Sequence, residues 1–201
     1  IKRYGFHGTS HEYVARKAAN YLKKPFDQCN FITFHLGNGA SVCLIHQGKS
    51  VDTSMGMTPL EGLIMGTRCG DLDPAILLYL QKTRGYTYED VDTLLNKQSG
   101  LKGLTGTNDM RDIEDRLQHN DPAAMLAIDM TVYRLQKYLG AYAAVSPQLD
   151  AIIFTGGIGE NSDLIREKML TPPSLLNIRI DAKSNQTARK QEIADISAGD
   201  S

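Results

Sequence analysis

Two glycine-rich segments of the chain could hold a phosphate group. The first is Gly37-Asn38-Gly39 and the second is Gly156-Gly157-Ile158-Gly159-Glu160-Asn161, and each follows an apolar run. Glycines let backbone N–H groups approach an anion, and the second segment precedes a predicted helix whose N-terminus favours negative charge. An Asn-Gly pair between strands is also typical of a two-residue hairpin turn, so the first segment has two interpretations. The second segment has neither the Walker pattern nor the Gly-x-Gly-x-x-Gly spacing of a dinucleotide-binding fold.

Arg68 lies between glycines in the segment Gly66-Thr67-Arg68-Cys69-Gly70-Asp71. A guanidinium held there could stabilise the charge on a transferring phosphoryl group. A turn closed by an ion pair between Arg68 and Asp71 is the other interpretation. Cys69 has no base partner that the sequence identifies, so a nucleophilic role is not favoured.

His7 and His35 also lie next to glycines, His7 before a predicted helix and His35 at the end of an apolar run. An imidazole in such a place could donate a hydrogen bond to phosphoryl oxygens or transfer a proton near neutral pH, although a lone histidine often has only a structural role. His11, His46 and His119 are predicted to be surface or packing residues. No spacing indicates a metal site, and the odd number of widely spaced cysteines predicts reduced thiols in a cytoplasm. The cysteines are Cys29, Cys43 and Cys69.

Mixed α/β structure is predicted to position these residues. Short apolar runs predict strands at 31–34, 40–45, 51–53 and 151–154, the last of the kind that is buried on both faces, and a weak strand at 177–180. Helices are predicted after a cap at Thr9 or Ser10, at 75–81, at 88–96, after Asp109, between 122 and 146, and from about Ser162. We expect the apolar side of the longest helix to pack on a sheet. That side comprises Met125, Ile128, Val132, Leu135, Leu139 and Tyr142.

The length and composition indicate an ordinary globular chain. Its 201 residues suit one domain or a piece of a larger protein, and the start at Ile1 and the polar end at 197–201 suggest that both ends were cut or left unobserved. The sequence has 22 Lys and Arg against 23 Asp and Glu, for a net charge of −1. This balance gives no basic patch for nucleic acid or for an anionic membrane. No apolar run approaches the roughly 18 residues of a membrane-spanning helix, and no export signal is visible.

Six sequence blocks, in order, resemble those of the acetate kinase family. The blocks are Arg3-Tyr4-Gly5-Phe6-His7-Gly8-Thr9-Ser10-His11, His35-Leu36-Gly37-Asn38-Gly39, Asp52-Thr53-Ser54-Met55-Gly56, Thr58-Pro59-Leu60-Glu61-Gly62, Gly66-Thr67-Arg68 and Phe154-Thr155-Gly156-Gly157-Ile158-Gly159-Glu160-Asn161. The resemblance implies the ribonuclease H-like fold that acetate and sugar kinases share with heat-shock chaperone ATPases and actin, a mixed sheet flanked by helices. It also implies that residues 1–201 are a single domain, most of the C-terminal nucleotide-binding half of a two-domain acyl kinase.

The same resemblance implies roles for individual residues. His7 and Arg68 correspond to the family's transition-state-stabilising histidine and arginine. The implied ATP or ADP contacts are His35, Leu36, Gly37, Asn38, Gly39, Asp109, Met110, Arg111, Gly157, Ile158, Gly159, Glu160 and Asn161. The family's Mg²⁺ ligands, substrate-binding Arg and catalytic Asp are expected outside this sequence, so no metal ligand is predicted within it. Cys69 stands where many relatives have Ser, a small change for the loop.

The expected activity of the parent enzyme is reversible transfer of the γ-phosphoryl group of ATP to acetate, which gives acetyl phosphate. Propionate kinase is the close alternative, because the acyl pocket is expected mostly outside this sequence. The isolated chain is alternatively a nucleotide-binding module without turnover. A chaperone-like or actin-like ATPase is a more distant alternative, which the His7 and Arg68 blocks disfavour. A homodimer and a bacterial cytoplasmic setting are expected from the resemblance alone.

Overall fold

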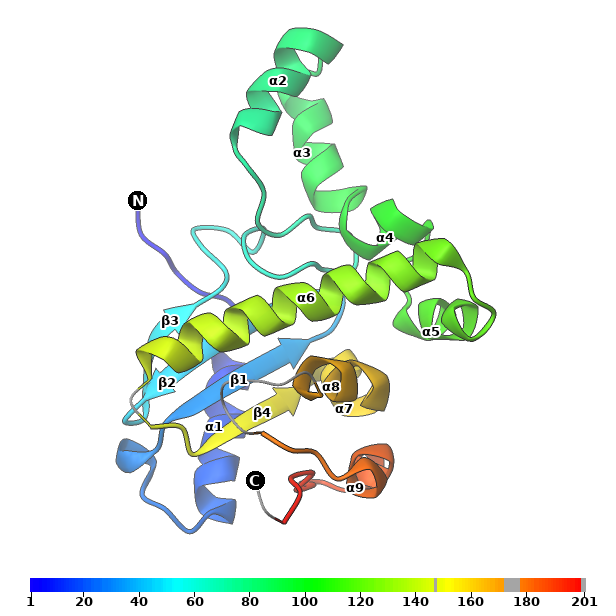
Figure 1. Ribbon diagram of the computed structural model, residues 1–201. Coiled ribbons are helices and arrows are strands. Elements are labelled where there is room, and N and C mark those ends of the chain that lie inside the picture. Colours follow the sequence, from blue (N-terminus) through cyan, green and yellow to red (C-terminus); the bar gives the residue numbers. More distant parts are fainter. Residues whose placement is uncertain (147, 172–177, 200–201) are drawn as a thin grey trace. The chain divides into compact units, whose positions relative to one another are not determined.

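A computed structural model describes residues 1–146, 148–171 and 178–199 of the protein (Figure 1). It is a mixed α/β structure with four named strands in these ranges, in the order β3-β2-β1-β4. The strands are β1 (Phe31–Leu36), β2 (Ala40–His46), β3 (Lys49–Thr53) and β4 (Ala151–Thr155). The helices are α1 (Gly8–Tyr21), α2 (Ala75–Arg84), α3 (Tyr88–Lys97), α4 (Gly100–Thr105), α5 (Met110–Gln118), α6 (Pro122–Val145), α7 (Gly156–Asn161), α8 (Asp163–Leu170) and α9 (Ala182–Thr187), with short 3-10 turns at Phe26–Gln28 and Ala188–Lys190.

The sheet joins a parallel pair to an antiparallel pair. β1 runs parallel to β4, with Phe31 opposite Ala151 and His35 opposite Thr155. β2 and β3 are antiparallel and are connected through Gln47 and Gly48, which both have positive φ as a tight hairpin of the I′ type requires. The strands predicted at 31–34, 40–45, 51–53 and 151–154 are therefore confirmed, and β1 and β4 both end next to a glycine-rich segment.

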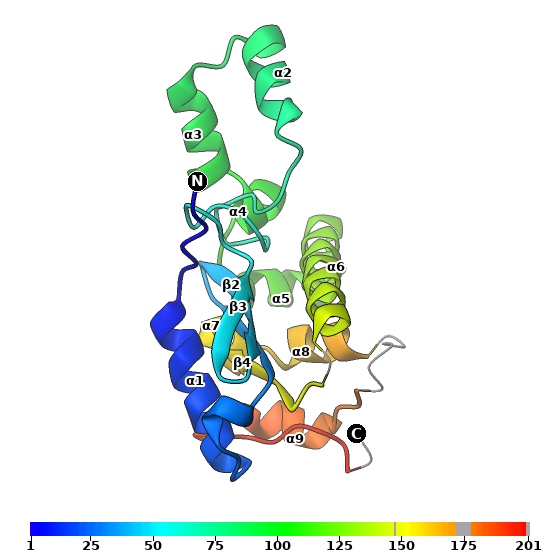
Figure 2. The ribbon, with the colours of Figure 1, turned by 90° about the vertical axis from the view of Figure 1, so that its left-hand side faces the viewer.

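Helices lie on both faces of this sheet. α1 packs against β1 and β4, and the core there includes Ala15, Ala19 and Phe31. Figure 2 shows α1 on one side of the sheet and the 132–145 part of α6 on the other. The apolar side of α6 is buried as predicted at Ile128, Val132, Leu135, Leu139 and Tyr142.

The described residues form two compact units. The first comprises Ile1–Phe6, Asn38–Ala40 and Ser54–Thr131, and the second comprises His7–Gly37, Ser41–Thr53 and Val132–Ser201. We call them the helical unit and the sheet unit. The expectation of a single domain stays a prediction, because compact units need not fold independently.

Several local expectations were wrong. Met125 is 44% exposed, because it lies off the buried side of α6 that Ala124 and Ala127 share with Ile128. Residues 151–154 are only partly buried, since β4 is at one end of the strand order. The glycine-rich residues 156–161 form the short helix α7, and α4 was not predicted.

Other expectations have mixed outcomes. α8 begins at Asp163 with Ser162 as its N-cap, as predicted. Of the predicted strand at 177–180, residue 177 lies outside the described residues, and Ile180 forms an isolated bridge with Ser197. The three cysteines are free thiols. No described helix combines the length and the apolar character that crossing a membrane requires.

Candidate functional site

The backbone around Arg68 is held by the end of α3 and the start of α4. The N–H groups of Leu101 and Lys102 donate to the carbonyls of Met65 and Gly66, at 2.9 Å each. Gly100 has φ +62°, and a Cβ there would lie 2.1 Å from the Met65 carbonyl oxygen. Only glycine fits this close approach, so the loop of Arg68 is fixed by backbone contacts.

The Arg68 side chain contacts the helical unit itself. Its Nη1 donates to the carbonyl oxygen of Pro59 at 3.1 Å and lies 3.7 Å from the Met65 sulfur. Asp71 accepts the Gly62 N–H at 2.8 Å. These contacts, rather than the Arg68–Asp71 ion pair considered from the sequence, orient the two side chains in the described structure.

Asn38 joins two further sequence blocks within the helical unit. Its carbonyl oxygen accepts the Gly66 N–H at 2.9 Å, and its side-chain oxygen accepts from the Asn108 amide at 2.9 Å. Neither Asn38 nor Gly39 has the positive φ that a type I′ turn needs. Residues 37–39 connect the neighbouring strands β1 and β2, but not through the two-residue type I′ turn considered from the sequence, and Asn38 also links the loops of Arg68 and Asp109.

Asp109 begins α5 as its N-cap. Its carboxylate accepts the Arg111 N–H at 3.0 Å and pairs with the Arg111 guanidinium, with Nη2 at 2.6 Å from Oδ2. These hydrogen bonds from Arg111 lower the pKa of Asp109 to about 2. The Arg111 side chain is 89% exposed, whereas Met110 between them is buried. Asp109 and Arg111 thus form a solvent-exposed ion pair at the start of α5, where Met110 is buried.

His7 is the N-cap of α1 in the sheet unit. Its φ is +61°, a left-handed conformation that is unusual for a residue other than glycine. Its Nδ1 lies 2.9 Å from the Ser41 hydroxyl oxygen, and its ring stacks on that of His35 at 4.0 Å between centroids. The structure therefore brings the two histidines that the sequence singled out side by side. The predicted capping by Thr9 or Ser10 was wrong, because α1 starts at Gly8 and Ser10 contacts His35 Nδ1 at 2.9 Å.

His11 was predicted to be a surface or packing residue, yet it joins this cluster. It is buried, with Nε2 at 2.7 Å from the Ser41 hydroxyl and Nδ1 at 2.7 Å from the Thr33 hydroxyl. Burial, reinforced by the neighbouring rings of His35 and His7, lowers its pKa from 6.5 to about 4. Burial also lowers the pKa of His35, an effect that the charge of Glu160 opposes. His11 is therefore a neutral ring near pH 7.

The second glycine segment contacts the end of β1. Gly156 has φ +80°, and a Cβ there would lie 2.6 Å from the Leu36 carbonyl oxygen. The Glu160 carboxylate accepts from the Thr155 hydroxyl at 3.0 Å, and Asn161 donates to the Gly157 carbonyl at 2.8 Å. Leu36 at the end of β1 thus lies against Gly156 and Gly159 of the second glycine segment.

A buried arginine on α8 donates a hydrogen bond to the backbone of α7. Arg166 donates to the carbonyl oxygen of Gly159 at 2.7 Å, and to Asn185 through its side-chain oxygen at 2.7 Å and its carbonyl at 2.8 Å. Burial lowers the pKa of this guanidinium, whereas the charge of Asp163 raises it. Sequence reading missed Arg166, because only the fold brings it to Gly159.

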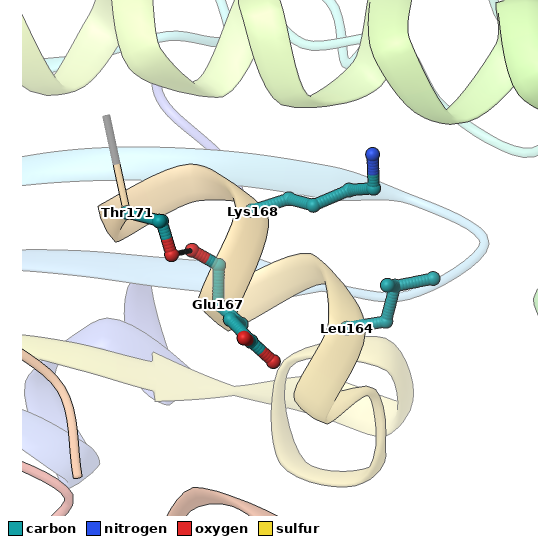
Figure 3. A pocket seen from close by; sticks show the side chains of 4 residues that line it. All are labelled: Leu164, Glu167, Lys168 and Thr171. Carbon is teal, nitrogen blue, oxygen red and sulfur yellow. Dashed lines mark hydrogen bonds between the residues drawn. The ribbon is translucent and has the colours of Figure 1, made fainter. Parts of the chain in front are cut away.

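One shallow hollow lies elsewhere on the sheet unit. It is lined by Leu164, Glu167, Lys168 and Thr171, all on α8 or directly after it (Figure 3). None of these residues belongs to the predicted site, and the Thr171 hydroxyl is already bonded to the Glu167 carbonyl at 2.5 Å.

Sequence comparison decides which family this arrangement represents. The family described as the Acetokinase family matches residues 1–201. The chain belongs to the acetokinase family. An acetate kinase of Campylobacter jejuni is 58% identical over 186 residues, which are 92% of this chain and 47% of that protein. An acetate kinase of Lawsonia intracellularis is 56% identical over 93% of this chain and 46% of its own length. The chain thus spans about half the length of these relatives.

Solved acetokinase structures have the same fold. The crystal structure of Porphyromonas gingivalis acetate kinase matches with a TM-score of 0.94 and 46% identity, over 99% of this chain and 50% of that one. A propionate kinase from Francisella tularensis matches with a TM-score of 0.93 and 42% identity, over 99% of this chain and 50% of that one. The actin-like α/β fold predicted from the sequence is confirmed.

The predicted acetokinase site residues fall into two sets. Arg68, Asn38, Gly39 and Asp109–Arg111 lie in the helical unit, whereas His7, His35–Gly37 and Gly157–Asn161 lie in the sheet unit. Within each unit the structure brings members of the set together. The residues that sequence reasoning missed are Gly100, Asn108, His11, Ser41, Thr33 and Arg166. A signal existed for Thr33 and Ser41, since both are hydroxyls inside otherwise apolar strands and a buried hydroxyl needs a partner.

Proposed function

We propose that this chain forms most of the nucleotide-binding half of an enzyme that transfers the γ-phosphoryl group of ATP to acetate, reversibly. The observation that carries the proposal is the match to the acetokinase family over residues 1–201. The identity of 58% to an acetate kinase supports it. The clustering of His7 with His35, and of Asn38 with the loops of Arg68 and Asp109, supports the assigned residues.

In the proposed reaction a carboxylate oxygen of acetate attacks the γ-phosphorus as the bond to the β,γ-bridging oxygen breaks. Acetyl phosphate and ADP result, and no covalent protein intermediate is needed. Positioning and electrostatic stabilisation supply most of the catalysis in such phosphoryl transfers. Arg68 is assigned to the charge that develops on the equatorial oxygens, and its fixed backbone suits it because a rigid donor needs no reorganisation. His7 is assigned the transition-state-stabilising role that the resemblance implies for it.

The nucleotide is assigned to the remaining predicted residues. Leu36–Gly39 and Gly157–Asn161 would hold the phosphates through backbone N–H groups, and His35 would border them. Asp109, Met110 and Arg111 would hold the adenosine at the start of α5. The exposed guanidinium of Arg111, pinned by Asp109, is suited to stack on a flat base or to bond the ribose.

Only membership of the family implies that Mg²⁺ takes part in the proposed reaction. Among the described residues, no three His, Cys, Asp or Glu side chains come together as a metal-binding group. Mg²⁺ in kinases is commonly held by one or two carboxylates and the nucleotide phosphates, and it would neutralise phosphate charge there. No residue of this chain is assigned as a Mg²⁺ ligand, so no catalytic step is assigned to a metal held by it.

Propionate is the alternative acyl substrate. The likeness to a propionate kinase from Francisella tularensis, at 42% identity, favours keeping it. Acetate and propionate differ by one methylene, which a pocket discriminates by only about 10-fold to 200-fold. Comparing kcat/KM for the two acids in an acetokinase that contains this chain tests the choice.

Binding and turnover should be measured side by side on this chain. Calorimetry with ADP or ATP and Mg²⁺ tests the nucleotide site, and a hydroxamate assay for acetyl phosphate tests the reaction. We expect binding without turnover from the chain alone, which would identify a nucleotide-holding module. Absence of nucleotide binding would contradict the proposed site, and turnover would mean that this chain holds a complete catalytic set.

A homodimer and a cytoplasmic location are further proposals. Every residue of α2 is at least partly exposed, and Ile76, Leu78 and Tyr79 expose 46%, 68% and 57% of their surface. Apolar side chains gathered on one exposed helix are typical of an interface. Light scattering on the native protein and on Leu78→Glu tests this, since the variant should be monomeric if α2 pairs two copies.

A further inference from the structure

A series of hydrogen bonds leads from the interior of the sheet unit to His7. Thr33 on β1, His11 on α1 and Ser41 on β2 are buried and lie in series. The distances are 2.7 Å from Thr33 Oγ1 to His11 Nδ1, 2.7 Å from His11 Nε2 to Ser41 Oγ and 2.9 Å from Ser41 Oγ to His7 Nδ1. At the far end the Thr33 hydroxyl donates to the Cys43 carbonyl at 3.5 Å.

The proton count of this series links the two rings. A serine hydroxyl has one proton, so Ser41 can donate to only one of the imidazoles. If it donates to His11 Nε2, then His7 must donate from Nδ1. If it donates to His7 Nδ1, then His11 must carry its proton on Nε2. The tautomers of His7 and His11 therefore change together.

The Cys43 carbonyl selects between these two directions. A carbonyl only accepts, so the Thr33 hydroxyl gives its proton to Cys43 and accepts from His11 Nδ1–H. His11 Nε2 then accepts from Ser41, and Ser41 accepts from His7 Nδ1–H. Both directions use every donor in the series, but only this one also gives the Cys43 carbonyl the Thr33 proton.

We propose that His11 and Ser41 are positioning residues that hold a proton on Nδ1 of His7 and thereby assign contact with the phosphoryl group to its Nε2. The part about the phosphoryl group rests on the proposed function. With Nδ1–H fixed, Nε2 can gain or lose a proton while every hydrogen bond of the series is kept. His7 thus becomes a charged donor without any rearrangement of the interior.

The neighbouring rings bind a proton less readily than an ordinary histidine does. His11, the nearest competitor in the series, is held neutral near pH 7 because its pKa is about 4. His35 stacks on His7, and burial lowers its pKa as well, against the opposing charge of Glu160. The strained left-handed φ of His7 agrees with a residue whose placement serves function.

Nitrogen-15 NMR of the histidine rings tests the coupling in this chain directly. In the native chain at pH 7.5 we expect His7 and His11 both to carry the proton on Nδ1. Thr33→Val keeps the shape of the side chain and removes the hydroxyl, so His11 should shift to the Nε2–H tautomer. His7 should follow, although Thr33 is bonded to His11 and not to His7. Opposite tautomers in the native chain, or a His7 that ignores Thr33→Val, would overturn the proposal.

Two variants keep this test sharp. Thr33→Ser retains the hydroxyl and should restore the native tautomers, which separates hydrogen bonding from packing. Ser10→Ala removes the partner of His35 and leaves the series untouched, so the His7 tautomer should not change. A Thr33→Ser spectrum like that of Thr33→Val would contradict the hydrogen-bond mechanism, even if Thr33→Val itself folds poorly.

Turnover separates this inference from the proposed function. In an acetokinase that contains this chain, Ser41→Ala should lower kcat about 10-fold to 100-fold and leave the KM for ATP nearly unchanged. Its kcat should also shift in pH profile, because the Nε2 proton of His7 is no longer governed by Ser41. An unchanged kcat and pH profile would remove the positioning role. Coupled tautomers in a protein that neither binds ATP nor turns over would instead refute only the proposed function.

Discussion

The helical unit and the sheet unit fix their predicted site residues in different ways. In the helical unit the contacts that hold the loop of Arg68 are between backbone atoms, such as Leu101 N–H to Met65 carbonyl, and a glycine at 100 makes room for them. In the sheet unit they are side-chain hydrogen bonds among buried rings and hydroxyls, such as His11 with Ser41. Hydrogen bonds between backbone atoms fix the position of a residue's main chain. A buried series of side-chain hydrogen bonds also fixes which atoms of the side chain carry protons.

The two arrangements suit the two kinds of residue. Arg68 carries a charge that does not titrate in proteins, so holding its loop in place is enough. The imidazole of His7 has two tautomers, so its neighbours must also specify which nitrogen carries the proton. Substitutions in the helical unit should therefore act through displacement, and isosteric substitutions in the sheet unit through proton placement.

The largest effect is expected from Arg68→Ala in an acetokinase that contains this chain. We expect kcat to fall about a thousandfold, as loss of an arginine that stabilises a phosphoryl transition state does. The affinity for ATP should change much less, because the role is confined to the transition state. Hydroxamate assays and calorimetry measure the two quantities.

Arg68→Lys is the matched control for charge. It keeps the cation and loses the planar fork of donors, so most of the loss in kcat should remain. A parallel loss of ATP affinity and kcat in Arg68→Ala would mean that Arg68 binds the ground state, and the comparison between the units would lose its functional basis.

The next effect is on stability, from Gly100→Ala. The new Cβ would lie 2.1 Å from the Met65 carbonyl oxygen at a φ of +62°. We expect a loss of about 3 kcal/mol or more, because the clash adds to the cost of the left-handed conformation. Denaturant unfolding measures it.

Gly106→Ala separates strain from contact. Gly106 also has positive φ, at +82°, but nothing lies within 4 Å of its Cβ position. It should cost only about 1 to 2 kcal/mol. Equal losses in the two variants would show that close backbone approach does not hold the loop of Arg68.

The difference between the units also explains how far the sequence could be read. The strands, the long helix α6 and the choice of His7 and Arg68 as candidate site residues follow from local patterns: apolar periodicity, and polar side chains set among glycines. The glycine pattern also identified Gly157–Asn161 as candidate site residues, but it did not predict that they form a helix. Family resemblance, not residue chemistry, pointed to Asp109–Arg111.

What local patterns missed depends on contacts distant in sequence. His11 meets Thr33 and Ser41 across 22 and 30 residues, and Arg166 meets Asn185 across 19. Spacing on a helix could not show that His11 faces two strands. Sequence reasoning identifies a candidate residue when its neighbours along the chain form a recognisable pattern. His11 and Arg166 meet their partners only in the folded structure.

Acidification should weaken the sheet unit through His11. The unfolded ring binds a proton below its ordinary pKa of 6.5, whereas the folded ring stays neutral down to about 4. The stability from this group is therefore complete above pH 6.5 and is lost as the pH falls toward 4. A shift of this size corresponds to roughly 3 kcal/mol. Denaturant unfolding across this range measures it.

His11→Gln should flatten the pH dependence, whereas His119→Gln, at an exposed ring, should preserve it. Asp109 does not contribute to the change in stability between pH 6.5 and 4, because its pKa is lowered from 3.8 to about 2 and so lies below this range. A native slope that survives in His11→Gln would show that the buried ring is not the group that acidification charges.

The smallest structural effect is expected from Arg111→Ala, which makes its functional effect the easiest to interpret. The Arg111 side chain is 89% exposed, and its partner Asp109 lies two residues away on the same helix start. Exposed ion pairs contribute little to stability, so the unfolding midpoint should not move measurably.

Binding then tells whether this exposed pair serves the nucleotide. We expect Arg111→Ala to weaken ADP binding about tenfold, the size of one lost stacking or hydrogen-bonding contact. Tripolyphosphate, which has no adenosine, should bind as before, and Lys102→Ala, which removes an exposed charge on α4, should leave both ligands unaffected. An equal loss of affinity for ADP and tripolyphosphate would indicate that Arg111 contacts the phosphates and not the adenosine. Because the fold is unchanged in either case, the result reports on ligand contact and not on the packing that holds the helical unit together.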